Sequence, residues 1–213
     1  VVMARGMKAI GTKVGDFEIR DEILHELRKF QGNPKTKIRE LHDFYEQKVH
    51  RLKRRRLHAV GASLVWFSPL LLEFRGQQIR GWLDVLAYGD TSQGKTSMAS
   101  RFMEFFQHGT MISGENCSAA GLMVGMERFG NKGFVAKHGA LPMNDGGMVI
   151  LEEYAAIDLQ IRKAMSESRD LGVCRASKIV QAEFLARCRK LFSANPVDEH
   201  GNTGWMRGVP HSC

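Results

Sequence analysis

The spacing of hydrophobic positions changes at about residue 60. In residues 1–60 the apolar side chains recur at helical intervals, and Ile23, Leu27 and Phe30 share one face of a first segment. A second segment, Thr36 to His58, carries a longer apolar stripe made of Ile38, Leu41, Tyr45, Val49 and Leu52. A proline in Gly32-Asn33-Pro34 separates the two, because proline removes a backbone donor and restrains the residue before it. The pattern predicts a helical, basic N-terminal arm over residues 1–60.

Short apolar runs alternate with helical segments over residues 61–213, which is typical of an α/β core. Buried strands are predicted at residues 83–88, 147–151 and 190–194, and a helix is predicted at 95–106. Polar residues follow each strand at its C-terminal end, where open α/β sheets bind ligands. We therefore expect a three-layer α/β core with a mostly parallel sheet.

The stretch after the first of these strands matches the phosphate-binding pattern G-x-x-x-x-G-K-[ST] at every fixed position. It consists of Gly89, Asp90, Thr91, Ser92, Gln93, Gly94, Lys95 and Thr96. Such glycines let backbone N–H groups cradle phosphate oxygens, and the following helix adds its positive dipole end. Lys95 would reach the β- and γ-phosphates and the Thr96 hydroxyl would ligate Mg²⁺. The strand and helix on either side disfavour a chance glycine turn, so the expected cofactors are ATP and Mg²⁺.

Two carboxylates, Glu152 and Glu153, end the second strand, in the place of a Walker B pair. In such a site the first supports Mg²⁺ through its water shell, and the second orients and deprotonates the attacking water. Most such motifs have aspartate first, and the longer Glu152 leaves its reach to the metal open. Asn195, after the third strand, would hold the water with Glu153, although Asn-Pro is also a common turn.

Composition is ordinary for a soluble globular protein, with 43% hydrophobic and 25% charged residues among 213. No apolar run reaches the roughly 18 residues of a membrane span, and the N-terminus lacks the apolar segment of a secretory signal. The cysteines have no metal-binding spacing and are interpreted as reduced thiols: Cys117, Cys174, Cys188 and Cys213. The net charge of +8 is compatible with a polyanionic partner.

A basic run, residues 51–56, lies near the end of the predicted arm. Its cations are Arg51, Lys53, Arg54, Arg55 and Arg56. Three interpretations stay open: contact with DNA, a nuclear address, or a solvated helix end whose cations the helix dipole favours. No aromatic residues interleave the run, so base stacking there has no support.

Three stretches around the phosphate loop together resemble the minichromosome maintenance (MCM) family of AAA+ DNA motors. They are Gly114-Glu115-Asn116-Cys117-Ser118-Ala119-Ala120-Gly121-Leu122, then Gly139-Ala140-Leu141-Pro142-Met143-Asn144-Asp145-Gly146-Gly147-Met148, then Phe184-Leu185-Ala186-Arg187 with Leu191-Phe192-Ser193-Ala194-Asn195-Pro196. The resemblance covers roughly residues 80–198. It implies an AAA+ ATPase of the helicase type that acts on single-stranded DNA in replication, as a homo-oligomeric ring, often a hexamer.

The resemblance also implies two hairpins that line the pore of such a ring, at residues 123–137 and 171–182. They would bring Lys132, Arg175 and Lys178 to the DNA backbone, where cations neutralise phosphates regardless of sequence. The chain departs from the family at Glu152 and in a longer second hairpin. The family's arginine finger and C-terminal lid would lie beyond Cys213, so we expect a partial chain or a degenerate relative.

Three functions compete on these observations. The main expectation is an MCM-like ATPase that remodels or unwinds DNA, with Lys95, Glu153 and Asn195 in the catalytic roles. The alternative is a nucleotide-gated binding or assembly protein with weak or no ATP turnover. A related AAA+ machine acting on protein is disfavoured by the first two resembling stretches. The expected location is the cytoplasm in a bacterial or phage setting and the nucleus in a eukaryote, and no membrane association is expected.

Overall fold

The computed structural model describes residues 20–130, 133–177 and 181–196, so Lys132, Lys178 and Cys213 lie outside the described residues. The chain divides into two units, residues 1–41 and 42–213. Helix α1 (Asp21–Arg28) belongs to the first unit, and α2 (Pro34–Phe44) begins in the first and ends in the second. The division falls earlier than the boundary expected at residue 60, because residues from His42 onward pack with the core.

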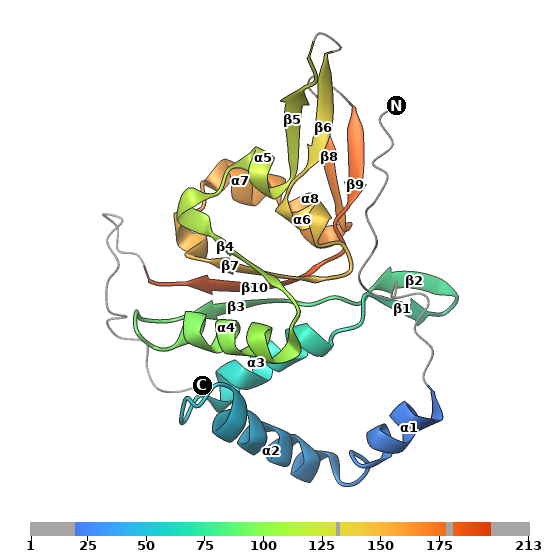
Figure 1. Ribbon diagram of the computed structural model, residues 1–213, viewed down its shortest axis with the longest axis vertical. Helices are drawn as coiled ribbons and strands as arrows, with labels where there is room; N and C mark the ends of the chain where they lie inside the picture. Colours follow the sequence, from blue (N-terminus) through green and yellow to red (C-terminus); the bar gives the residue numbers. More distant parts are fainter. Residues whose placement is uncertain (1–19, 131–132, 178–180, 197–213) are drawn as a thin grey trace. The chain divides into compact units, whose positions relative to one another are not determined.

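Four parallel strands form the central sheet of the second unit, in the order β3-β10-β7-β4 (Figure 1). The strands are β3 (Asp84–Tyr88), β4 (Thr110–Ser113), β7 (Met148–Glu152) and β10 (Arg189–Ala194). In the middle of the sheet Phe192 of β10 pairs with Leu86 on one side and Leu151 on the other. The three strands predicted from the sequence are confirmed to within one residue at each end. The burial predicted for β3 is wrong, because it is an edge strand of the described sheet and its Leu86 and Tyr88 are 50% and 55% exposed.

Helices cover both faces of this sheet (Figure 1). On one face lie α3 (Arg56–Phe67) and α4 (Lys95–Phe106), where the rings of Trp66 and Phe102 have centroids 5.7 Å apart. On the other lie four short helices, α5 (Ala119–Leu122), α6 (Ala140–Met143), α7 (Leu159–Ala164) and α8 (Ser166–Asp170). The chain therefore has the expected three-layer α/β core with a mostly parallel sheet.

Strand alternation supplies the apolar side chains for both layers. Val149 and Leu151 of β7 join the buried cluster beneath the short helices, together with Leu122 and Phe192. Their neighbour Ile150 is equally buried but does not belong to that cluster, as expected for the opposite face. Burial on both faces explains why β7 reads as a continuous apolar run in the sequence. No helix in the described ranges is long and apolar enough to cross a membrane.

The described part of the second unit also contains three antiparallel pairs of strands: β1 (Leu71–Phe74) with β2 (Gln77–Arg80), β5 (Val124–Arg128) with β6 (Phe134–His138), and β8 (Val173–Ala176) with β9 (Ala182–Leu185). The last two occupy the segments where the family resemblance implies hairpins. They lie side by side (Figure 1), and the rings of His138 on β6 and Phe184 on β9 have centroids 4.0 Å apart.

The single long helix expected from Thr36 to His58 is wrong. After α2 one π-helical segment, Tyr45–Val49, follows, and α3 begins only at Arg56. Between them the backbone N–H of Leu52 donates to Nδ1 of His50 at 3.1 Å, and Arg51 has a φ of 56°. A side-chain bond to the backbone and left-handed residues compete with the helix and interrupt it.

Candidate nucleotide-binding site

The candidate residues meet at one edge of the central sheet. Because β3, β10 and β7 are parallel neighbours, their carboxyl ends lie together. The phosphate loop follows β3, Asn195 follows β10, and the glutamate pair consists of the last residue of β7 and the next residue. The loop is tied to β10 by a hydrogen bond of 3.3 Å from the backbone N–H of Gly89 to the carbonyl oxygen of Ala194. The sheet thus unites residues that are about a hundred positions apart, such as Lys95 and Asn195.

The phosphate loop turns into α4 through residues with left-handed backbone. Ser92 has a φ of 60° and Gly94 a φ of 82°, and α4 begins at the next residue. A Cβ on Gly94 would lie 2.8 Å from Cδ1 of Leu52, which is the end of a side chain that can shift, so the position requires glycine mainly for its left-handed backbone. The loop therefore presents the N-terminus of a helix of 12 residues, which is suited to an anion.

The ammonium group of Lys95 lies at the centre of the site. Its Nζ donates to the carbonyl oxygens of Gly89 at 2.7 Å and Asp90 at 2.6 Å, and to Oδ1 of Asn195 at 2.8 Å. Burial lowers the pKa of Lys95, and the negative charges of Glu153 and Asp90 partly offset that effect. All three acceptors are neutral, so this cation is held ready for an anion that would bind it more strongly.

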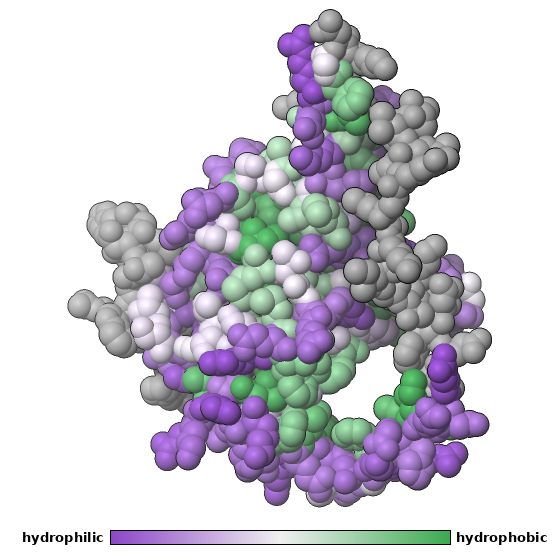
Figure 2. All heavy atoms as spheres, viewed as in Figure 1, coloured by the Kyte–Doolittle hydropathy of each residue, from purple (hydrophilic) through white to green (hydrophobic). Residues whose placement is uncertain are grey.

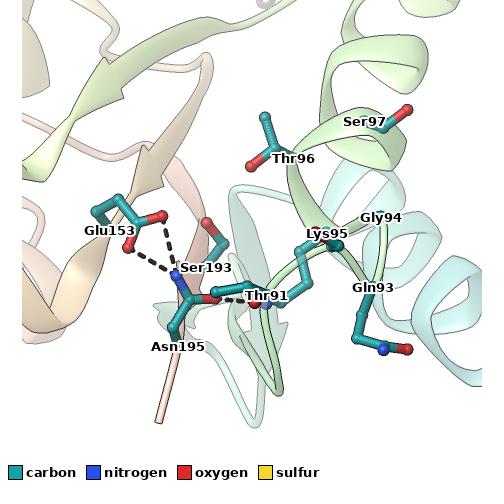
Figure 3. A pocket seen from close by; sticks show the side chains of 10 residues that line it. Thr91, Gln93, Gly94, Lys95, Thr96, Ser97, Glu153, Ser193 and Asn195 are labelled. Atoms are coloured by element: carbon teal, nitrogen blue, oxygen red, sulfur yellow. Dashed lines mark hydrogen bonds between the residues drawn. The ribbon is translucent and has the colours of Figure 1, made fainter. Parts of the chain in front are cut away.

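Asn195 bridges Lys95 and Glu153 (Figure 3). Its Nδ2 donates to both carboxylate oxygens of Glu153, at 3.1 and 3.0 Å. The orientation of the amide follows from its partners, because an ammonium can only donate and a carboxylate can only accept. The result is a continuous hydrogen-bonded path from the phosphate loop to the carboxylate expected to act as base.

The backbone at Glu153 is strained. Its φ of 47° and ψ of 46° are left-handed, which costs a non-glycine residue roughly 1–2 kcal/mol and is common at functional sites. Gly114, at the end of β4, packs against this turn: a Cβ there would lie 2.5 Å from the carbonyl oxygen of Glu153 and 2.7 Å from that of Glu152. The close approach at Gly114 therefore supports the turn that directs Glu153.

A cavity of about 510 Å³ contains most of the candidate side chains (Figure 3). It is lined by Thr91, Ser92, Gln93, Gly94, Lys95, Thr96, Ser97, Glu153, Ser193 and Asn195. That volume is in the range of small-molecule sites. Sequence reasoning missed Ser193 and Ser97. The signal for Ser193 was available, because it lies on β10 two residues before Asn195, and alternate residues of an extended chain point to the same side.

Glu152 differs from the other candidates because it does not line this cavity. One of its carboxylate oxygens, Oε1, is buried and has no hydrogen-bond partner among the described residues. A buried carboxylate oxygen without a partner is suited to accept a hydrogen bond from a water molecule bound to a cation. Thr96, the other residue expected at Mg²⁺, lines the cavity. Within the described ranges no three His, Cys, Asp or Glu side chains gather as a metal site, so Mg²⁺ would also need phosphate and water ligands, as it commonly does.

Of the three residues expected at DNA, only Arg175 lies in the described part of the chain. It is on β8, where its Nε donates to Glu183 on β9 at 2.6 Å and its Nη1 donates to Glu167 on α8. These bonds raise the pKa of Arg175, the bond to Glu183 most of all. Two carboxylates thus already neutralise this guanidinium, and they would have to release or share it before it could bind a DNA phosphate.

The family model of the MCM P-loop domain matches residues 34–204, which is most of the chain. The chain belongs to this family. Among its relatives are the maternal DNA replication licensing factor mcm6 of Xenopus tropicalis, 32% identical, and the DNA replication licensing factors mcm6 of Schizosaccharomyces pombe, 30% identical, and mcm-6 of Caenorhabditis briggsae, 31% identical. Each match covers 57% of this chain and 14–15% of the relative, so the chain spans only a small part of the length of these proteins.

Proposed function

We propose that this chain binds MgATP and hydrolyses it as the motor module of an MCM-like replication protein that acts on single-stranded DNA. The observation that carries the proposal is the path from Lys95 through Asn195 to Glu153, with hydrogen bonds of 2.8, 3.0 and 3.1 Å along the cavity. It combines a cation for phosphate, an amide for water and a carboxylate for proton abstraction within one small volume.

Phosphate binding would exchange the partners of Lys95. Its Nζ now donates to backbone carbonyls of the loop, and a phosphate oxygen would replace these neutral acceptors by an anion that attracts the ammonium more strongly. The loop N–H groups and the start of α4 would take further phosphate oxygens. Bound Mg²⁺, held by Thr96 and through water by Glu152, would neutralise the charge that develops on the phosphates.

Hydrolysis would then depend on Glu153 and Asn195. Glu153 is half-buried at the cavity wall and accepts only from the Asn195 amide among the bonds described here, so its carboxylate can take a proton from water. Asn195 would hold that water by its amide, since it already points at both the lysine and the base. The hydroxyl of Ser193 lies in the same cavity and would add a second polar contact.

DNA binding is proposed for the two adjoining hairpins. Figure 2 shows hydrophobic residues next to hydrophilic ones on the surface of the β5–β6 hairpin. The side chains of Phe129, Phe134 and Val135 there are 51%, 48% and 53% exposed. Exposed aromatic rings beside cations suit single-stranded nucleic acid, because every base can stack on them. Lys132 and Lys178 would add phosphate contacts, and Arg175 would do so after releasing a carboxylate.

The cellular setting follows from the relatives. Those named above are replication licensing factors of eukaryotes, so of the two settings considered we propose the nucleus rather than a bacterial or phage cytoplasm. We also propose that the module works within a ring, and a homo-oligomeric hexamer stays a prediction that the mass of the assembly in solution would test. The resemblance implies an arginine from a neighbouring subunit, so assembly and turnover should be measured together.

The test begins with nucleotide binding and continues with turnover. The parent chain is expected to bind MgATP, and Lys95→Ala is expected to lose that binding because the phosphates lose their buried cation. Glu153→Gln is expected to keep MgATP binding while it abolishes turnover, since a neutral amide cannot accept the proton from water. Turnover that single-stranded DNA raises in the parent alone would support the motor. Equal binding by the parent and by Lys95→Ala would refute the proposed site.

A second function, nucleotide-gated binding or assembly, has one observation in its favour. Glu152 replaces the usual aspartate and lies outside the cavity lining, so the metal would be supported less directly than in most such sites. This alternative predicts MgATP binding through Lys95 with weak or no turnover in the assembled ring, and no increase when DNA is added. Glu152→Asp separates the two functions, because it would raise turnover if the longer side chain alone limits the motor.

A further inference from the structure

The basic run of residues 51–56 lies against the phosphate loop. Leu52 packs on Gly94, where a Cβ would come within 2.8 Å of its Cδ1, and an NH2 group of Arg55 donates to Oε1 of Gln93. Both contacts join the run to the loop across about forty residues of sequence. Of the three interpretations of the run, none anticipated that it would lie at the phosphate loop.

The helix-end interpretation is wrong in its direction for the last two cations of the run. Arg55 precedes the first residue of α3 and Arg56 is that residue, so these cations lie at the N-terminus of a helix and not at the C-terminus. The dipole disfavours cations there, the first turn has no acidic residue, and no side chain caps it. Arg54 adds a left-handed φ of 61°. Cations at an uncapped helix N-terminus and a left-handed arginine are both unfavourable, and such unfavourable local features are typical of functional segments.

A second cavity, of about 560 Å³, extends from this segment to the loop. Arg55 and His58 line it from one side and Asp90, Gln93 and Lys95 from the other; Gln93 and Lys95 also line the first cavity. The two cavities are therefore neighbours on one loop, and Arg55 lines the second together with Lys95, which lines both. The present acceptor of Arg55, the Gln93 amide, is neutral.

We propose that Arg55 binds the polyphosphate of the nucleotide within the same chain, as a second cation beside Lys95. This rests on the proposed function and adds a residue to the same site. A phosphate would replace a neutral amide acceptor by an anion, which adds the attraction between opposite charges to the hydrogen bond. The planar guanidinium also matches two phosphate oxygens at once. Asp90, which lines the same cavity, adds a negative charge that a second cation offsets.

The experiment compares Arg55→Gln with a matched control, Lys53→Gln. Lys53 is an exposed cation of the same run, it lines neither cavity, and its substitution removes the same charge. MgATP binding is measured by titration calorimetry at one ionic strength, and inorganic tripolyphosphate serves as a competitor without a nucleoside. Thermal unfolding of each variant checks that the fold is kept, and Arg55→Lys tests the guanidinium against a simple charge.

Arg55→Gln is expected to weaken MgATP and tripolyphosphate by the same factor, about tenfold or more for one charge-assisted contact. Arg55→Lys should lose less, and Lys53→Gln should change either affinity by no more than about twofold because screening weakens distant charges. Equal losses of affinity in Arg55→Gln and Lys53→Gln would show that the positive charge of the whole run attracts the phosphates and that Arg55 makes no specific contact, which would overturn the proposal. A loss for MgATP without a loss for tripolyphosphate would assign Arg55 to the nucleoside and overturn the proposal. If Lys95→Ala loses binding and Arg55→Gln does not, only this inference fails; if the parent does not bind MgATP, the proposed function fails with it.

Discussion

Replacing Asn195 with aspartate changes one atom of the hydrogen-bonded path. The Nδ2 that donates to both oxygens of Glu153 at 3.0 and 3.1 Å becomes an oxygen, which cannot donate unless it is protonated. Two carboxylates about 4 Å apart repel by about 4 kcal/mol at an effective dielectric constant near 20. Attraction to Lys95, whose Nζ lies 2.8 Å from Oδ1 in the parent, offsets a similar amount.

The hydrogen bonds lost to a charged acceptor therefore decide the outcome. Bonds of this kind contribute about 1.5–3 kcal/mol each, and we expect Asn195→Asp to lower the free energy of unfolding by about 2–3 kcal/mol at pH 7.5 once solvent screening is allowed for. The folded variant should take up a proton between its paired carboxylates more readily than the unfolded chain does. Its stability is then lost as the pH rises and is partly recovered near pH 5.

Urea denaturation of the parent, Asn195→Asp and Asn195→Ala at pH 5 and pH 7.5 measures this effect. The alanine variant removes the same bonds without adding charge, so its deficit should be nearly the same at both pH values. Asn195→Asp should also bind MgATP more weakly than Asn195→Ala, because the added carboxylate lies in the phosphate cavity. An aspartate variant as stable as the parent at pH 7.5, or a deficit that ignores pH, would show that the amide does not bridge Lys95 and Glu153.

Three further predictions concern the frame of the site. Burial raises the pKa of Asp145, but hydrogen bonds from Arg187 outweigh this effect and leave the pKa lowered. Asp145→Asn should therefore lower the free energy of unfolding by about 1–2 kcal/mol above pH 4. Denaturation at several pH values should show this difference disappear as acid protonates the carboxyl of the parent. Burial lowers the pKa of the three histidines at 42, 50 and 58, so stability should be lost as the pH falls below about 6.5, and His50→Gln should make that slope shallower. Gly114→Ala should cost about 1–3 kcal/mol and reduce MgATP turnover, because its Cβ meets two backbone oxygens, whereas Gly61→Ala in α3 should be neutral or stabilising in thermal unfolding.

Elements that are encoded by a short apolar run or by a contiguous motif were predicted correctly from the sequence. The strands β7 and β10 are short runs buried on both faces, and β3 is a short apolar run at the edge of the described sheet. Helix α4 follows a glycine loop whose sequence pattern is required for binding phosphate, so all four elements were predictable locally. The helix over residues 36–58 was not, because its period continues through His50 to Leu52 while a side-chain bond and contact with Gly94 interrupt the chain there. Tyr45 and Val49 were nevertheless correctly expected in an apolar stripe, since they are 2% and 8% exposed.

The sequence by itself determined the phosphate loop, the strand-end polar residues and membership of the MCM P-loop family, because each is written in neighbouring residues. The tertiary structure decided which of them touch. Parallel pairing of β10 between β3 and β7 brings Asn195 between Lys95 and Glu153, and no local period encodes that meeting. The same holds for Ser193, for Gly114 and for Arg55 beside Gln93, whose roles depend on contacts between segments far apart in the chain. Residue type can be read locally, but distance between segments is set by how the sheet and helices pack.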